Sequence, residues 1–393
     1  MKAAIVGAGA AGCFCAIELK RRLPSADVTV YESGRKPLSK VAITGGGRCN
    51  LTNSFEGISS LSEAYPRGDR LMNRVFRTFD HKNTWDWFEA EGVKLVLQDD
   101  HCVFPASQDA MEIVNLLETR MRQQGVRILT GTKVSDIRKL LDEYDAVVVT
   151  TGGIPAPEGY SILEGLDLVI VQPVPSLFTF NLPSSPVREL MGTVVENATV
   201  SLAGTRFKAS GPLLVTHWGM SGPAVLKLSS YAARHLADCG YHAPLLVGWM
   251  EGGKDNEIRG RLQSMAEEYP HRIIINTHPA EIPSRLWSYL VTKSGIREDA
   301  RWSELGSKSL NRLTSTLGTD EYAIKGKSRF REEFVTCGGV ALSNIDLDTL
   351  ECKRHPGLYF AGEVLDVDAI TGGFNLQAAW STGYRAAVSI SEK

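Results

Sequence analysis

Three glycines near the start of the chain have the spacing that lets a backbone bind phosphate groups. Gly7, Gly9 and Gly12 directly follow the apolar run at residues 2–6, and a helical pattern continues from there to about Arg22. In a βαβ unit the first glycine permits a tight turn, the second lets a pyrophosphate approach, and the third lets the helix pack on the strand. The N-terminus of such a helix offers unpaired N–H groups to an anion.

An acidic residue completes this pattern. Residues 27–32 alternate as a second strand and end in Glu32, whose carboxylate can accept hydrogen bonds from a ribose. A tight turn without a ligand needs only one glycine. Strand, glycine turn, helix, second strand and acid together therefore predict a dinucleotide site.

A second group of glycines lies near the other end of the chain. Residues 357–363 (GLYFAGE) read as a buried strand that runs into Gly362 and Glu363, and Gly372 and Gly373 precede a helical pattern from about 376 to 391. A ligand that both chain ends contact is long, as an extended FAD is. The dipole of such a helix also stabilises the negative charge of a reduced flavin. These observations favour FAD, held non-covalently.

The chain contains no second G-x-G-x-x-G motif, because the glycine run at 45–47 leads to Asn50 where the motif needs glycine. A separate NAD(P)H domain is therefore not expected. If NAD(P)H reduces the flavin, it acts as a transient reductant that visits a shared site.

The composition limits the partners. The 393 residues include 43 Lys and Arg against 45 Asp and Glu, so no broad basic surface for a nucleic acid is expected. Seven cysteines without a C-x-x-C pair favour a reducing compartment, here the cytoplasm. The eight histidines lack H-x-H and H-x-x-x-H spacing, so no metal site is expected. No apolar run has the roughly 20 residues of a membrane span. The expected partner is a small-molecule substrate, and the oligomeric state stays open.

The middle of the chain predicts a sheet, an inserted module and a return to the sheet. Before Gly152 and Gly153, strands are expected at 126–130, 133–137 and 146–150, with Val134 mid-strand and able to offer backbone groups to an adenine edge. From about residue 183 a β-rich pattern predicts strands at 194–202, 205–209, 213–217, 244–250 and 321–325, a helix at 222–237, and three helical stretches between 256 and 317.

A few further side chains are candidates for contact with a ligand. Arg48 matches phosphate oxygens in geometry and is expected near the flavin or its pyrophosphate. Cys49 is interpreted as a packing residue rather than a redox thiol. His217 and Trp218 lie in a glycine-bounded turn that faces either substrate or solvent. Asp366 and Asp368 either bond a ribityl chain or cap the next turn, and the first role is preferred for Asp366. No residue is assigned as a catalytic acid or base.

Several segments resemble one known family. They are residues 40–53 (KVAITGGGRCNLTN), 103–107 (VFPAS), 216–223 (THWGMSGP), 335–340 (VTCGGV) and 357–377 (GLYFAGEVLDVDAITGGFNLQ). Together they resemble the BaiN-like (YhiN-type) bacterial FAD-dependent oxidoreductases, which include aminoacetone oxidase-like proteins. The segment at 151–160 is shorter than is usual in that family, which leaves the substrate undetermined.

The resemblance implies an α/β fold: a glutathione-reductase-type, Rossmann-like FAD-binding domain with an inserted small β-barrel that carries a helical subdomain. The implied boundaries are 1–183 and 333–393 for the FAD-binding domain, 184–253 and 319–332 for the barrel, and 254–318 for the helical insertion. The implied flavin contacts are Gly7, Gly9, Ala10, Ala11, Gly12, Glu32, Lys40, Arg48, Asn50, Val134, Thr151, Gly152, Gly153, Gly362, Glu363, Asp366, Gly373, Phe374, Asn375 and Leu376.

Three functions are compatible with this interpretation. The first is an FAD-dependent oxidoreductase whose flavin, reduced by NAD(P)H or by substrate, passes hydride from N5 to a small organic acceptor. The second is an amine oxidase, aminoacetone oxidase-like, that releases peroxide. The third is a non-redox or RNA-associated flavoprotein.

Overall fold

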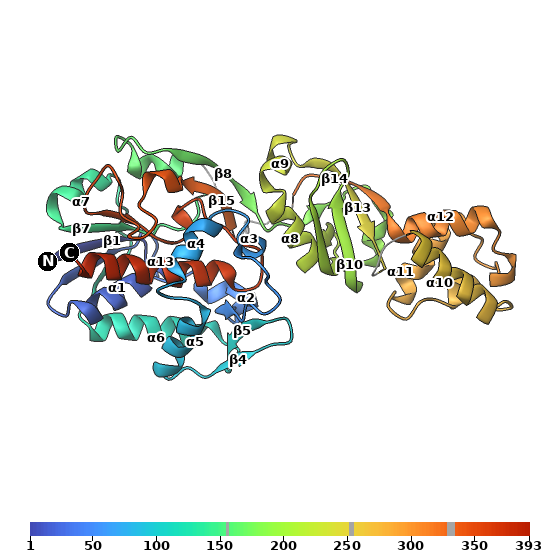
Figure 1. Cartoon of the computed structure of the whole chain (residues 1–393), viewed down its shortest axis with the longest axis horizontal. Coiled ribbons are helices and arrows are strands. Elements are labelled where there is room, and N and C mark those ends of the chain that lie inside the picture. Colours follow the sequence, from blue (N-terminus) through green and yellow to red (C-terminus); the bar gives the residue numbers. More distant parts are fainter. Residues whose placement is uncertain (155–156, 251–254, 328–334) are drawn as a thin grey trace. The chain divides into compact units, whose positions relative to one another are not determined.

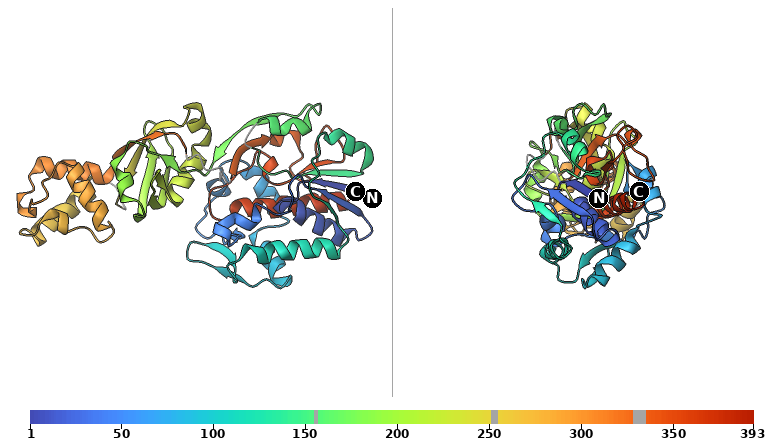
Figure 2. Two further views of the ribbon diagram at one scale, coloured as in Figure 1. Left: turned by 180° about the vertical axis from the view of Figure 1, so that it is seen from behind. Right: turned by 90° about the vertical axis from the view of Figure 1, so that its left-hand side faces the viewer.

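The chain forms two compact units. The computed structural model describes residues 1–154, 157–250, 255–327 and 335–393 (Figure 1). The first unit combines residues 1–175 with 335–393, and the second consists of residues 176–334. Both termini belong to the first unit and lie side by side (Figure 2). The domain boundaries expected from the sequence stay predictions, and those at 253–254 and 332–333 lie outside the described residues.

A five-stranded parallel sheet, of order β16-β7-β1-β2-β6, forms the centre of the first unit. Three neighbouring strands, β1, β7 and the edge strand β16, are almost fully buried, as parallel strands covered on both faces are expected to be. The strands are β1 (Lys2–Val6), β2 (Asp27–Tyr31), β6 (Arg127–Leu129), β7 (Ala146–Val149) and β16 (Leu358–Phe360).

Two long helices from opposite ends of the sequence pack together in this unit (Figure 1). They are α1 (Ala10–Arg22), which follows β1, and α13 (Phe374–Ser391), which ends the chain, and α6 (Ala110–Gln123) also packs on α1. The remaining helices are α2 (Thr44–Gly47), α3 (Leu61–Ala64), α4 (Asp69–Val75), α5 (His81–Ala90) and α7 (Ile137–Glu143).

Smaller elements complete the first unit. Three short antiparallel strands form one sheet, and two strands form another at the junction with the second unit. They are β3 (Thr52–Asn53), β5 (Cys102–Pro105) and β4 (Leu95–Leu97), then β8 (Ile170–Ser176) and β15 (Val335–Val340). Short 3₁₀ helices include η1 (Val41–Ile43), η2 (Pro157–Leu163), η6 (Leu342–Asn344) and η7 (Gly362–Val364).

The strand predicted at 133–137 is wrong. Residues 132–136 have no regular secondary structure, and α7 begins at Ile137. The Asp136 carboxylate accepts a hydrogen bond from the Arg138 N–H at 2.9 Å and so caps this helix. A side-chain acceptor at the N-cap satisfies one of the free N–H groups of the first turn, which favours a helix start over a continued strand.

The second unit contains an antiparallel sheet of six strands. Its order is β14-β13-β10-β11-β12-β9, and a bridge between Phe180 and Lys327 connects the last strand to the segment after the first, which nearly closes a barrel. The strands are β9 (Phe180–Asn181), β10 (Val194–Leu202), β11 (Lys208–Val215), β12 (Gly219–Ser221), β13 (His242–Gly248) and β14 (Asp320–Lys325).

Two predictions within the barrel need correction. The strands expected at 205–209 and 213–217 are the single strand β11, because Gly211 has a φ of +140° and continues the ladder beyond a bulge in β10. The helix expected at 222–237 is divided at Ala232 into α8 (Pro223–Tyr231) and α9 (Ala233–Asp238).

Three helices follow β13, as predicted, and they share one core with the barrel. They are α10 (Asp255–Glu268), α11 (Ser284–Lys293) and α12 (Ser307–Gly318). Val200 and Val247 of the barrel belong to the same buried cluster as Leu286 and Trp287 of α11. The α/β fold with an inserted barrel-like sheet and helices is therefore confirmed. No helix within the described ranges has the length and apolar character needed to cross a membrane.

A buried ion pair connects the segment before α4 to the segment before α13. The Arg67 Nε donates to the Asp368 Oδ1 at 2.6 Å, and a second guanidinium nitrogen contacts Oδ2. Asp368 is fully buried and the Arg67 side chain is 15% exposed. A pair of this kind is difficult to replace on one side only, because the remaining charge is left without a partner.

We expect Arg67→Ala to lower the free energy of unfolding by about 3–5 kcal/mol, because it removes the guanidinium that pairs with the fully buried Asp368 carboxylate. Arg74→Ala is the matched control, since Arg74 pairs with Asp348 at an exposed site and such pairs contribute at most about 1 kcal/mol. Denaturant unfolding of both variants measures the difference. Equal losses would contradict a structural role for the buried pair.

Candidate functional site

The glycine turn between β1 and α1 is tight at its first and third glycines and open at its second. Gly7 has a φ of +110°, and a Cβ there would lie 2.4 Å from the Thr150 carbonyl oxygen. A Cβ on Gly12 would lie 2.0 Å from the Gly7 oxygen, so this glycine lets the helix contact the turn. A Cβ on Gly9 would meet nothing within 4 Å. Only the second glycine therefore faces open space, where a phosphate can approach the backbone.

Glu32, directly after β2, is held beside this turn. Its Oε2 accepts a hydrogen bond from the Ala8 N–H at 2.9 Å, and its Oε1 accepts one from the Gly34 N–H at 2.6 Å. These backbone bonds fix the position of the half-buried carboxylate. Each oxygen keeps a further lone pair that a ribose hydroxyl can use.

A cation and a carboxylate converge at the carboxyl end of β7. The Lys40 Nζ lies 3.5 Å from the Glu363 Oε2, and Glu363 Oε1 accepts a hydrogen bond from the Thr336 N–H at 2.8 Å. A Cβ on Gly153 would lie 2.4 Å from Glu363 Oε1, and one on Gly152 would lie 3.8 Å from Lys40 Nζ. Four predicted site residues from three parts of the sequence therefore meet here.

The two ends of the chain also meet, as the dinucleotide hypothesis requires. A Cβ on Gly362 would lie 2.9 Å from the Ala11 Cβ, and one on Gly383 would lie 2.5 Å from the Ala11 oxygen. The Gly362 N–H donates to the Thr382 hydroxyl at 2.9 Å, which anchors η7 on α13. Ala11 and its neighbour Ala10 form the first turn of α1, so this turn lies against both η7 and α13.

The N-terminus of α13 carries no side-chain cap. Its N-cap is Gly373, with a φ of +86°, where a Cβ would lie 2.3 Å from the Thr52 oxygen. The Asn50 amide, oriented to satisfy both neighbours, donates to the Thr52 oxygen at 3.1 Å and accepts from the Gly373 N–H at 3.3 Å. Asn50 thus connects the glycine loop at 44–47 to the start of α13. The first N–H groups of α1 are likewise uncapped by a side chain, so two helix N-termini in this unit are available to an anion.

The three residues after Gly373 support the start of α13. The Asn375 amide accepts from the Ala369 N–H at 2.9 Å and donates to the Ala369 oxygen at 3.0 Å, so both of its polar atoms hold the preceding turn. The Phe374 carbonyl accepts a hydrogen bond from the Tyr65 hydroxyl at 2.9 Å. Leu376 is half-buried. Any cofactor contact from these residues stays a prediction.

Two predicted contacts lie apart from the groups above. Arg48 is exposed, donates to the Gly45 oxygen at 3.1 Å, and places its guanidinium 4.3 Å from the centre of the Phe104 ring. Val134 is half-buried in the segment before α7. The structure does not bring either side chain to Lys40 and Glu363, and their roles stay predictions.

The two aspartates before α13 differ in their surroundings. Asp366 is half-buried, and its backbone N–H donates to the Val340 oxygen at 2.9 Å. Asp368 is fully buried and pairs with Arg67, so its carboxylate is committed to the fold. Asp366 is thus the one that remains a candidate for the cofactor.

The remaining candidates are Cys49, His217 and Trp218, and their surroundings are those of ordinary structural residues. Cys49 is fully buried with a φ of +60°, and burial raises the pKa of its thiol to about 12, which fits a packing residue. His217 and Trp218 are exposed in the turn between β11 and β12, with ring centres 4.4 Å apart. The Arg188 Nε donates to the His217 oxygen at 2.7 Å and holds this turn.

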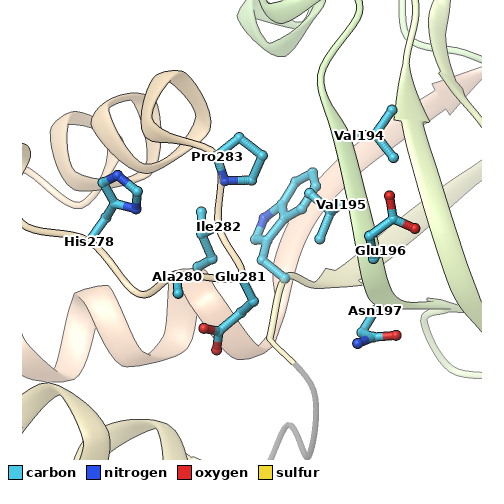
Figure 3. A pocket seen from close by; sticks show the side chains of 10 residues that line it. Val194, Val195, Glu196, Asn197, His278, Ala280, Glu281, Ile282 and Pro283 are labelled. Atoms are coloured by element: carbon cyan, nitrogen blue, oxygen red, sulfur yellow. The ribbon is translucent and has the colours of Figure 1, made fainter.

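A depression of about 320 Å³ in the second unit does not have the character of an active site. Val194, Trp249 and Ile282 give it apolar walls. Figure 3 shows Glu196 on the barrel strand and Glu281 on the opposite wall, pointing away from each other. Among the described lining residues, the polar side chains do not converge on a common point.

Two buried hydroxyls in the first unit have no partner of normal geometry. They are the Thr151 Oγ1 and the Tyr160 hydroxyl, both in the segment that follows β7. A buried polar group without a partner costs roughly 1–3 kcal/mol, so native proteins rarely keep one without a ligand or water. Thr151 was predicted; Tyr160 and the Thr336 N–H were not. Tyr160 and Thr336 lie in segments 151–160 and 335–340, which the sequence motifs did indicate, but no residue pattern pointed to either residue itself.

These observations fit a bound dinucleotide. The open Gly9, the acid after β2, two uncapped helix N-termini and two unpaired buried hydroxyls all belong to the first unit. The fold and the site together define a dinucleotide-binding protein of the Rossmann-like class, with a site built from both ends of the chain.

Comparison with known sequences gives the family. The family described as HI0933-like protein Rossmann domain matches residues 1–389, so the chain belongs to this family of FAD-dependent oxidoreductases. The resemblance inferred from the sequence motifs is thereby confirmed, and so is FAD as the cofactor class. The individual flavin contacts stay predictions.

Curated relatives align with the chain from end to end. The 3-dehydro-bile acid delta(4,6)-reductase of Clostridium scindens is 27% identical, over 99% of this chain and 98% of that protein. The ribosomal RNA dihydrouridine synthase of Haemophilus influenzae is 29% identical, with the same coverage. Among solved structures, a 3-ketosteroid delta1-dehydrogenase from Sterolibacterium denitrificans is 12% identical, with a TM-score of 0.48 over 99% of each chain.

We expect Gly9→Val to fold but to be purified without yellow flavin. Gly9 has a φ of −85° and open space at its Cβ position, so valine fits the protein but occupies the space that a pyrophosphate needs. Gly306→Val is the matched control, because Gly306 is also an uncapped helix N-cap with open space, at the start of α12. The visible absorbance ratio and thermal unfolding are measured for both. A Gly9→Val protein with a full flavin load would refute this placement of the phosphates.

Proposed function

We propose that this chain is an NAD(P)H-fed reductase that uses FAD to saturate a carbon–carbon double bond conjugated to a carbonyl group. The observation that carries the proposal is the end-to-end alignment with two relatives. Their names describe a bile-acid delta(4,6)-reductase and a dihydrouridine synthase. A 3-oxo-dienone and a uracil ring share a carbon–carbon double bond activated by a carbonyl, so a single chemistry serves both.

The cofactor would supply the redox step by accepting hydride from NAD(P)H and delivering it from N5 to one carbon of the activated double bond, and a proton from solvent would complete the saturation at the other carbon. The chain's own groups bind and orient it. The uncapped N-terminus of α13 offers N–H groups and positive dipole to the charge of a reduced ring. The Lys40–Glu363 pair, fixed by the Thr336 N–H, forms a polar boundary beside the glycines after β7. The lack of a second G-x-G-x-x-G motif supports a shared site for NAD(P)H and substrate.

Two classes of substrate could contain the double bond: a free small molecule or a base within an RNA. A free small molecule, without a nucleic-acid partner, is the expectation from the nearly balanced charge of the whole chain. A uracil in ribosomal RNA is supported by the Haemophilus influenzae relative. It is also supported by the charge of the second unit, which has more basic than acidic residues although the whole chain is slightly acidic. A local basic excess favours a polyanion partner.

We expect NADH or NADPH to bleach the protein-bound flavin under anaerobic conditions, and an acceptor with a conjugated double bond to restore the yellow colour. Stopped-flow absorbance measures both half-reactions. Two acceptors are compared: a 3-oxo-dienone steroid, and RNA that carries unmodified uridine, whose product is detected as dihydrouridine by mass spectrometry. Bleaching by small amines alone, with peroxide formed when air is readmitted, would instead identify an amine oxidase. Bleaching by none of these reagents would reject both functions.

A further inference from the structure

Tyr160 is a buried tyrosine whose hydroxyl proton has no acceptor among the described residues. Tyr160 lies in η2 and is 6% exposed. The Ile154 backbone approaches its hydroxyl oxygen, but the hydroxyl donates no hydrogen bond within the described part of the chain. The Thr151 hydroxyl, in the same connection after β7, is buried and unpaired as well. Phenylalanine would pack equally well at a site that needs only the ring. Two unpaired donors in one connection therefore point to a ligand that accepts hydrogen bonds.

The surroundings of Tyr160 place it among the groups described above. Burial, together with the negative charges of Glu363 and Asp366, raises the pKa of Tyr160 to about 12. The phenol therefore stays protonated near neutral pH and acts as a hydrogen-bond donor. Glu363 already accepts a hydrogen bond from the Thr336 N–H and contacts Lys40. The phenol is thus left as a donor near carboxylates that belong to the predicted flavin contacts.

We propose that Tyr160 is a further residue of the cofactor site, and that its hydroxyl donates a hydrogen bond to an acceptor atom of bound FAD. The inference rests on FAD occupying this site, as the proposed function requires. FAD suits this donor because its ring carbonyls, ring nitrogens and ribityl oxygens are all acceptors. Both unpaired donors follow β7: Thr151 comes two residues after its last residue, and Tyr160 lies in η2.

The test is Tyr160→Phe, which removes the hydroxyl and keeps the ring. We expect the flavin-free variant to unfold at nearly the same temperature as the parent, because the removed hydroxyl donates no hydrogen bond within the described part of the chain. We expect its affinity for FAD to fall roughly tenfold, as for the loss of one hydrogen bond, and its visible spectrum to shift. Flavin-free protein is titrated with FAD, and the quenching of flavin fluorescence is followed.

Tyr359→Phe is the matched control. Tyr359, on β16, is 1% exposed, and its ring lies beside the Lys393 ammonium rather than in the 151–160 connection. It should bind FAD with the parent's affinity. Thr151→Val, which removes the second unpaired hydroxyl at nearly constant volume, should weaken FAD binding in the same way as Tyr160→Phe.

Three results would overturn the proposal. The first is parental FAD affinity and spectrum in Tyr160→Phe. The second is a loss of thermal stability in the flavin-free variant that accounts for any loss of FAD, which would make the hydroxyl structural. The third is unchanged FAD binding with slower reduction of the double bond, which would assign the hydroxyl to substrate. Because the titration uses neither NAD(P)H nor an acceptor, its outcome is separate from that of the proposed reductase activity.

Discussion

The first unit depends on one close backbone approach, between the first turn of α1 and the middle of α13. A side chain at Gly383 would clash with the Ala11 oxygen, and one at Gly12 would clash with the Gly7 oxygen. These contacts bring the glycine turn after β1 and the segment before α13 into the same region, although they lie at opposite ends of the sequence. The remaining groups of the site, from Lys40 to Glu363, are arranged around this contact.

Much of this arrangement could be predicted, because the sequence pattern is strong at positions where the backbone requires glycine. The turn at Gly7–Gly12, the acid at Glu32, and the strand and glycines near Gly362 and Gly373 all occur where their spacing indicates. Each of these positions serves a backbone requirement that few residue types can meet. The inserted barrel and its three helices could also be predicted, because the spacing of apolar residues changes from every second residue in the strands to nearly every fourth residue in the helices.

What could not be predicted depends on tertiary partners. Asp136 caps α7, although the sequence at 133–137 equally suits a strand. Asp368 and Asp366 look alike in sequence, yet Asp368 is fully buried in a pair with Arg67 whereas Asp366 is half-buried. The unpaired hydroxyl of Tyr160 is a property of its burial and not of its neighbours in the chain. Arg48 has the chemistry of a phosphate ligand, but Phe104 provides a ring for it to stack on.

The first unit is built from two separate stretches of the sequence, so it can be completed only after the second unit has been synthesised. The second unit, residues 176–334, has its whole sequence available while β16 and α13 are still untranslated. Domains fold as units as they emerge from the ribosome, so the inserted unit is the first that can fold completely. Until then the apolar surface of α1 that α13 later covers is exposed in the nascent chain. The first unit can therefore be completed only after β16 and α13 have been made, because both belong to it.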